Sequence, residues 1–150
     1  MDSSQVGLLL AIIVLVVFSA FFSASETSFT SLNKVRLMNM EDQGNKRASA
    51  VLKMSENYDK LLSTILVGNN IVNILATSLS SVLFASLIIN NASLATTVST
   101  IVMTVVVLIF GEITPKMLAK MRPESVAMAF YPILKFFSVR SEERRVGKEC

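Results

Sequence analysis

The 150-residue sequence contains no histidine and no tryptophan, and its one cysteine, Cys150, is the last residue. Without histidine the chain lacks a common ligand of zinc and cannot form a histidine proton relay. A single cysteine cannot form an intramolecular disulfide. Metal sites without histidine or cysteine ligands are built from oxygen atoms, which suit hard cations such as Mg²⁺, Ca²⁺ or Na⁺.

Charge is absent from two long stretches, Val6 to Ser25 and Leu61 to Gly111. About 20 apolar residues cross the hydrocarbon core of a bilayer, so the first stretch predicts one membrane span. The second is too long for one helix and has the turn sequence INNAS near its middle, so it predicts two. The sequence predicts an all-α membrane protein with three spans, at about 5–28, 60–88 and 93–116.

A cleaved signal peptide is the other interpretation of the first apolar stretch. Signal peptides usually begin with a basic region. The N-terminus here, MDSSQV, has Asp2 and no basic residue, and the helical pattern continues past the apolar stretch without an obvious break from Ser23 to Met40. These features favour a retained span whose helix extends into the cytoplasm.

The basic residues indicate the orientation. They occur between the first two spans and after the third, and are absent from the N-terminus and from the Asn90–Asn91 turn. The positive-inside rule then predicts a multi-pass protein of the plasma membrane with its N-terminus outside and its C-terminus cytoplasmic. Basic tracts interleaved with aromatic residues are missing, so no nucleic-acid partner is expected.

The cytoplasmic segments predict amphipathic juxtamembrane helices. One follows the break at Gly44, and another begins at Pro123 and runs to about residue 139, with an apolar side suited to the membrane interface. The last residues, 140–150, read RSEERRVGKEC and resemble the translation of a common sequencing adapter. We expect residues 1–139 to be one membrane domain, 140–150 to be an artefactual tail, and the natural protein to continue beyond residue 139.

Polar residues form three clusters within the predicted spans. Ser19 and Ser23 are four residues apart, as are Asn69 and Asn73, and each pair shares one helical face. Glu112 follows Gly111 in the third span, and Pro115 lacks the N–H that would bond the Gly111 carbonyl. Freed carbonyls in interrupted spans can coordinate cations. By helical rise the three clusters lie at a similar depth, where they could converge.

Structural roles are the alternative for each cluster. Serine and asparagine in spans often serve helix packing, and Glu112 could pair with Lys116 four residues later. Asn70 points about 100° away from Asn69 and is expected to be a packing or dimer contact. No nucleophile–base pair has recognisable spacing, so an enzyme is not expected.

Three motifs, FSASETSFTSLN, GNNIVN and GEITPK, resemble the transmembrane domain of the CorC/cyclin M (CNNM) family of magnesium transporters over about residues 5–139. The resemblance implies a lipid-embedded homodimer that exports Mg²⁺ by alternating access, with Na⁺ as coupling ion. It also implies a following cytosolic pair of CBS modules, which these 150 residues do not contain. The metal ligands that it implies are Ser23, with Ser25 as the alternative in its motif, Asn69, Asn73, Gly111 and Glu112.

A second function remains open. A membrane anchor and dimerisation module for a cytosolic regulatory domain would keep the packing serines. It would not need Glu112 beside a freed carbonyl.

Overall fold

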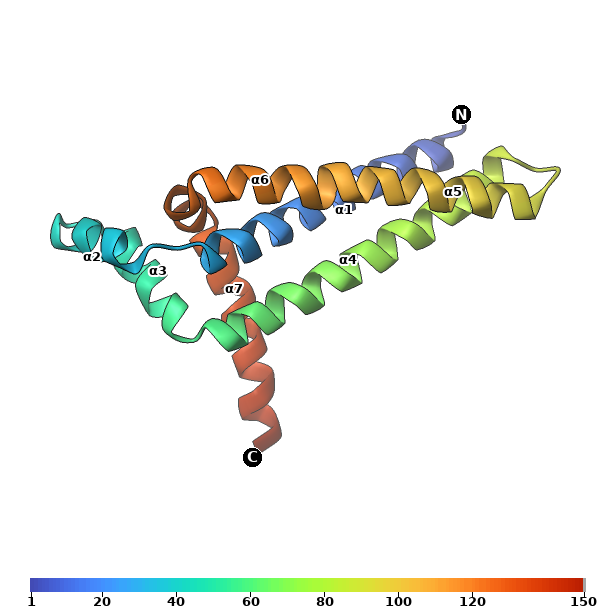
Figure 1. The fold of residues 1–150 in the computed structure, drawn as a ribbon. Helices are drawn as coiled ribbons and strands as arrows, with labels where there is room; N and C mark the ends of the chain where they lie inside the picture. Colours follow the sequence, from blue (N-terminus) through green and yellow to red (C-terminus); the bar gives the residue numbers. More distant parts are fainter. Residues whose placement is uncertain (150) are drawn as a thin grey trace. The chain divides into compact units, whose positions relative to one another are not determined.

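The computed structural model describes the backbone of residues 1–149 and the side chains of residues 1–137. The described chain is helical, without strands. Its elements in order (Figure 1) are α1 (Ser3–Thr30), α2 (Lys34–Asp42), α3 (Lys46–Glu56), α4 (Tyr58–Leu87), α5 (Ala92–Val106), the π-helix η1 (Val107–Ile113), α6 (Thr114–Met121) and α7 (Pro123–Glu149). The side chains of residues 140–150, which we expect to be an artefactual tail, lie outside the described ones.

Three helices are long and apolar enough to cross a membrane: Ser3–Thr30, Tyr58–Leu87 and Ala92–Met121. The predicted fold class, an all-α protein with three spans, is confirmed. The third span is a composite of α5, η1 and α6, and it continues five residues past the predicted end. The helix predicted to start at Pro123 is α7, which continues to Glu149.

One local expectation was wrong: the helix after the first span does not run unbroken to Met40. Instead α1 ends at Thr30, and α2 begins after Asn33, which has an extended backbone. The Asn33 side-chain oxygen accepts hydrogen bonds from the N–H groups of Val35 and Arg36, at 3.0 and 3.2 Å. Asparagine at this N-cap position satisfies donors that a helix start leaves unpaired, so a new helix begins here.

The chain forms two compact units. The first comprises residues 1–23 and 68–115, and the second comprises residues 24–67 and 116–150. Helices α1 and α4 and the composite third span each contribute to both units, and each unit is described by itself below.

Small buried residues lie in the interior of the first unit beside an apolar cluster of Ile12, Leu83 and Met103, while many other large apolar residues face outward. Ser19, Ser80 and Ser99 are almost fully buried, as are Ala76 and Ala95. The exposed residues include many large aliphatic and aromatic side chains, among them Ile13, Val17, Ile71, Ile74, Ile101 and Phe110. Spans in lipid pack this way because small side chains let helices approach closely and hydrocarbon solvates the large ones.

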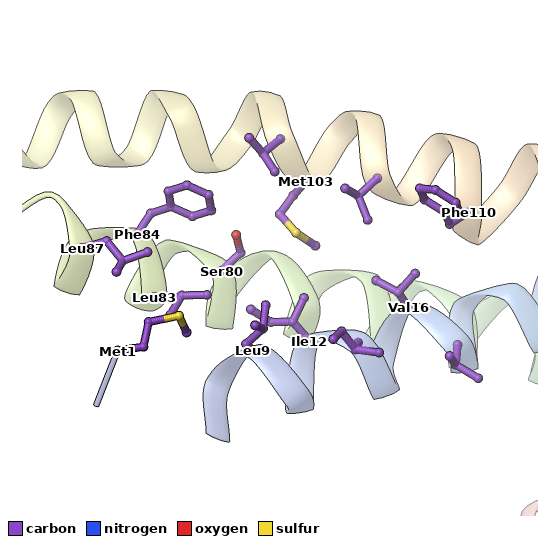
Figure 2. A pocket seen from close by; sticks show the side chains of 14 residues that line it. Met1, Leu9, Ile12, Val16, Ser80, Leu83, Phe84, Leu87, Met103 and Phe110 are labelled. Atoms are coloured by element: carbon purple, nitrogen blue, oxygen red, sulfur yellow. The ribbon is translucent and has the colours of Figure 1, made fainter. Parts of the chain in front are cut away.

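An apolar groove of about 580 Å³ lies within the first unit (Figure 2). Of the residues that line it, Ser80 is the polar one, and its hydroxyl lies 2.9 Å from the Ser99 hydroxyl on α5. The groove therefore offers no free ligand to a cation. Its lining suits hydrocarbon.

Caps and one buried carboxylate organise the second unit. Gly44, with φ +91°, forms the turn between α2 and α3, and Asn45 caps α3. Glu124, in the first turn of α7, is 7% exposed. Its Oε1 accepts a hydrogen bond from the Asn33 N–H at 3.4 Å, and its Oε2 lies 3.8 Å from Arg36 Nη1. Glu124 thus joins the start of α7 to the start of α2.

Replacing Glu124 with alanine removes the acceptor of the Asn33 N–H and the ion-pair partner of Arg36. We expect the α2 amides to exchange with deuterium about 10-fold faster, which corresponds to a loss of about 1–2 kcal/mol. Glu41→Ala, at an exposed position of α2, is the matched control and should leave exchange unchanged. Equal exchange in both variants would show that the Glu124 contact does not stabilise α2.

Candidate cation site

The three predicted spans come into direct contact around Ser19. The Ser19 hydroxyl on α1 donates a hydrogen bond to Asn69 Oδ1 on α4 at 3.1 Å. On η1, a Cβ atom placed on Gly111 would lie only 3.0 Å from Ser19 Oγ. Ser19 was noted in the sequence as a neighbour of Ser23 but was not among the predicted ligands. Its spacing of four residues from Ser23 was the signal that could have identified it.

A second close approach lies beside the first. The Phe22 ring of α1 fills the space next to Gly68 of α4, so that a Cβ atom on Gly68 would lie 2.8 Å from the ring. Any larger residue at position 68 would force Phe22 to move. Gly68 and Gly111 therefore allow α1 to contact both neighbouring spans at the level of Asn69.

These contacts establish the register of the helices. Gln5 bonds Ser86 at 3.1 Å and Ser19 bonds Asn69, so α1 and α4 run antiparallel. The Ser80–Ser99 bond and the shared position of Asn69 and Gly111 beside Ser19 show that the third span is antiparallel to α4. The third span is therefore parallel to α1, and Glu112 lies between the levels of Ser19 and Ser23.

The register separates two of the predicted ligands. Ser23 lies one turn beyond Ser19 in one direction, and Asn73 lies one turn beyond Asn69 in the opposite direction. At 1.5 Å per residue their levels differ by about 12 Å. Two ligands of one Mg²⁺ lie at most about 4 Å apart, because each Mg–O bond is about 2.1 Å. That Ser23 and Asn73 bind one ion together stays a prediction.

Ser23 and Asn73 nevertheless share a distinctive property. Ser23 Oγ and Asn73 Oδ1 are the buried side-chain polar atoms without a hydrogen-bond partner in the described part of the chain. Buried polar atoms almost always have a partner, because an unpaired one costs about 1–3 kcal/mol. Both atoms are oxygens with free lone pairs. They are therefore the two positions where a bound cation or water would satisfy an unmet acceptor.

Glu112 is half-buried and forms neither an ion pair nor a hydrogen bond within the described residues. The alternative of a structural pair with Lys116 is thus not formed. A carboxylate in a span normally has a partner or faces a water-filled path. Glu112 supplies the negative charge that a cation site in this unit requires.

The backbone around Glu112 is π-helical, which the sequence did not predict. The Thr114 N–H bonds the Ile109 carbonyl five residues earlier. Pro115 has no N–H to donate. With α-helical spacing the carbonyl left without a donor is that of Gly111, and with π-helical spacing it is that of Phe110. The predicted acceptor at Gly111 thus has a neighbouring candidate at Phe110. Short π-helical segments are frequent at functional sites.

Two residues fall outside the cluster. Ser25 is fully buried but belongs to the second unit, so the structure does not place it with Asn69 or Glu112. Asn70 is exposed on α4, in agreement with its predicted position away from Asn69. The cluster in the first unit therefore consists of Ser19, Ser23, Asn69, Asn73, Gly111 and Glu112.

Comparison with known proteins identifies the family. The model of the cyclin M transmembrane N-terminal domain matches residues 10–140. The chain belongs to this family. It is 45% identical over 109 residues to the UPF0053 inner membrane protein YfjD of Escherichia coli K12, covering 73% of the chain and 25% of the relative. It is 38% identical over 151 residues to a UPF0053 protein of Haemophilus influenzae, covering 93% and 35%.

A more distant relative has a functional name. The chain is 30% identical over 138 residues to the polyamine export protein of Escherichia coli K12, covering 85% of the chain and 31% of that protein. The chain thus spans about a quarter to a third of the length of these relatives. The family match and the three apolar helices together make this chain a membrane domain of the cyclin M family.

The close approach at Gly68 predicts a specific loss of stability in this cyclin M domain. Gly68→Ala should destabilise the domain by about 1–3 kcal/mol, because the Phe22 ring must shift. Gly7→Ala, on α1 with open space around it, should be neutral or stabilising by up to about 1 kcal/mol. Thermal unfolding in detergent measures both. If the two variants unfold alike, Gly68 does not limit the approach of the helices.

Proposed function

We propose that this domain transports Mg²⁺ across the membrane and that the ion binds beside Ser19. In this proposal the ligands are Ser23, Asn69, Glu112 and a carbonyl oxygen of the π-helical turn at Phe110 or Gly111. Asn73, about one turn farther along the same face of α4, receives the ion as it moves. The observation that carries the proposal is the pair of buried, unpartnered oxygens at Ser23 and Asn73.

The chemistry of the cluster favours a hard cation. Every candidate ligand is an oxygen atom, from hydroxyl, amide, carboxylate or backbone carbonyl groups, and such ligands suit Mg²⁺. Among the described residues no group of three His, Cys, Asp or Glu side chains could hold a metal ion. A single carboxylate with neutral oxygens gives modest affinity, which a transported ion needs because it must also leave.

The separation of Ser23 and Asn73 assigns them different steps. An ion at the level of Glu112 is within reach of the oxygens on the Ser23 side of the Ser19–Asn69 hydrogen bond. Asn73 lies on the other side of that bond. We therefore assign Glu112, Ser23 and Asn69 to binding, and Asn73 to movement of the ion. A shift of about one helical turn between packed helices is a known way for such a step to occur.

The remaining features of the proposal come from the sequence and the family resemblance. The distribution of lysine and arginine supports an outside N-terminus and a cytoplasmic C-terminus in the plasma membrane. The spans expose many large apolar side chains, and in a homodimer a second copy of the chain would cover part of this apolar surface while lipid covers the rest. Na⁺ coupling and an accompanying cytosolic CBS pair are parts of the proposal that rest on the family resemblance alone.

Polyamine export is the second candidate function. It rests on the relative named polyamine export protein. A polyamine is an extended chain with several positive charges, whereas the described cluster offers one carboxylate. The cluster therefore favours a compact cation, and transport of spermidine against Mg²⁺ distinguishes the two cargoes.

Glu112→Ala should weaken Mg²⁺ binding to the purified chain by more than about 10-fold. Loss of a group that only hydrogen-bonds a metal ligand already lowers metal affinity by about 10-fold, and Glu112 is proposed to bind the ion directly. Calorimetry measures binding, and a Mg²⁺-sensitive dye inside proteoliposomes measures transport. Asn70→Ala is the matched control, an exposed asparagine on the same helix, and should bind and transport like the parent. Unchanged binding in Glu112→Ala would refute the site, and no saturable binding in the parent would favour the membrane-anchor alternative.

Asn73→Ala separates binding from movement. Because Asn73 lies about a turn from the proposed binding level, binding should stay within about twofold of the parent. Transport should nevertheless fall, since the next acceptor along α4 is gone. Loss of binding equal to that in Glu112→Ala would instead mean that Asn73 and Glu112 hold one ion together.

A further inference from the structure

A small basic pocket lies within the second unit, where the end of α3, the start of α4 and α7 come together. Its volume is about 200 Å³. Three lysines line it, one from each helix: Lys53, Lys60 and Lys135. Its other lining includes the apolar side chains of Ala50, Met54 and Leu61. The pocket thus combines positive charge with an apolar surface.

Within the part of the chain whose side chains are described, no acidic group compensates the charge of the pocket. No carboxylate lines it, and none of its lysines forms an ion pair among the described side chains. Glu56 and Asp59, the acids nearest in sequence, are exposed and are not part of the lining. Lys135 Nζ lies over the Tyr131 ring, 5.8 Å from its centre, in a cation–π contact. Three like charges around one small cavity attract an anion.

The position of the pocket indicates the kind of anion. Lys60 is in the first turn of α4 and directly precedes the uncharged stretch that starts at Leu61. The pocket therefore opens at the end of a membrane span, where lipid headgroups lie. Tyrosine is enriched at this level, and Tyr131 lines the pocket. Lysine binds phosphate as a point charge.

We propose that this pocket binds a phosphate group, and that anionic phospholipid supplies it. The three lysines hold the phosphate, while the apolar lining contacts the adjoining part of the lipid. A freely soluble phosphate compound would use the lysines but gain nothing from Ala50, Met54 and Leu61. The site lies in the second unit and does not depend on the proposed cation transport.

The test titrates the detergent-solubilised 150-residue chain with fluorescent short-chain phosphatidylglycerol and follows anisotropy. The triple variant Lys53→Gln/Lys60→Gln/Lys135→Gln should bind about 100-fold more weakly, at about fivefold for each lysine. The matched control is Lys34→Gln/Lys46→Gln/Lys120→Gln, which removes the same charge at exposed positions outside the pocket. The control should lose far less affinity. Replacing the three pocket lysines with arginine should retain binding.

Two further arms identify the source of the phosphate. Short-chain phosphatidylcholine, whose phosphate is neutralised by choline, should bind weakly, and inorganic phosphate should compete only poorly. Competition by inorganic phosphate as strong as by the lipid would keep the phosphate site but assign it to a soluble ligand. Equal weakening in the pocket and control variants, or equal binding of phosphatidylcholine, would overturn the proposal.

Discussion

The hydrogen bond between Ser19 and Asn69 is the contact on which the first unit depends. At hydrocarbon depth water cannot satisfy a polar group, so a serine and an asparagine on adjacent spans must find each other. The bond forms because Gly111 leaves room beside Ser19 and Gly68 leaves room for the neighbouring Phe22 ring. Once these residues meet, the register of all three spans follows.

That register arranges oxygen atoms along the helices instead of gathering them at one point. Ser23 and Glu112 lie to one side of the Ser19–Asn69 bond, and Asn73 lies to the other. A resident structural metal would need its ligands together, within one coordination sphere. A cation that enters, binds and leaves is better served by successive oxygens and by a single carboxylate that does not hold it too tightly.

The second unit uses its polar groups differently. Asn33 and Asn45 cap helices, and Glu124 connects the starts of α2 and α7, so these groups have partners within the protein. Among the described side chains, the lysines at positions 53, 60 and 135 lack such partners, and they surround a cavity next to an apolar span. The asparagine caps and Glu124 stabilise this unit, whereas the three pocket lysines indicate a ligand.

The sequence by itself determined the three spans and the direction of Asn70, away from Asn69 on α4. These are local properties, set by hydropathy and by helical periodicity. Only the tertiary structure decided the rest. Which turn of one helix meets which turn of another depends on side chains far apart in the chain. The pairing of Ser19 with Asn69, the opposite displacements of Ser23 and Asn73, and the π-helical turn before Pro115 therefore could not be predicted. Close packing at two glycines selected that register, and with it the levels at which the polar side chains of the three spans lie.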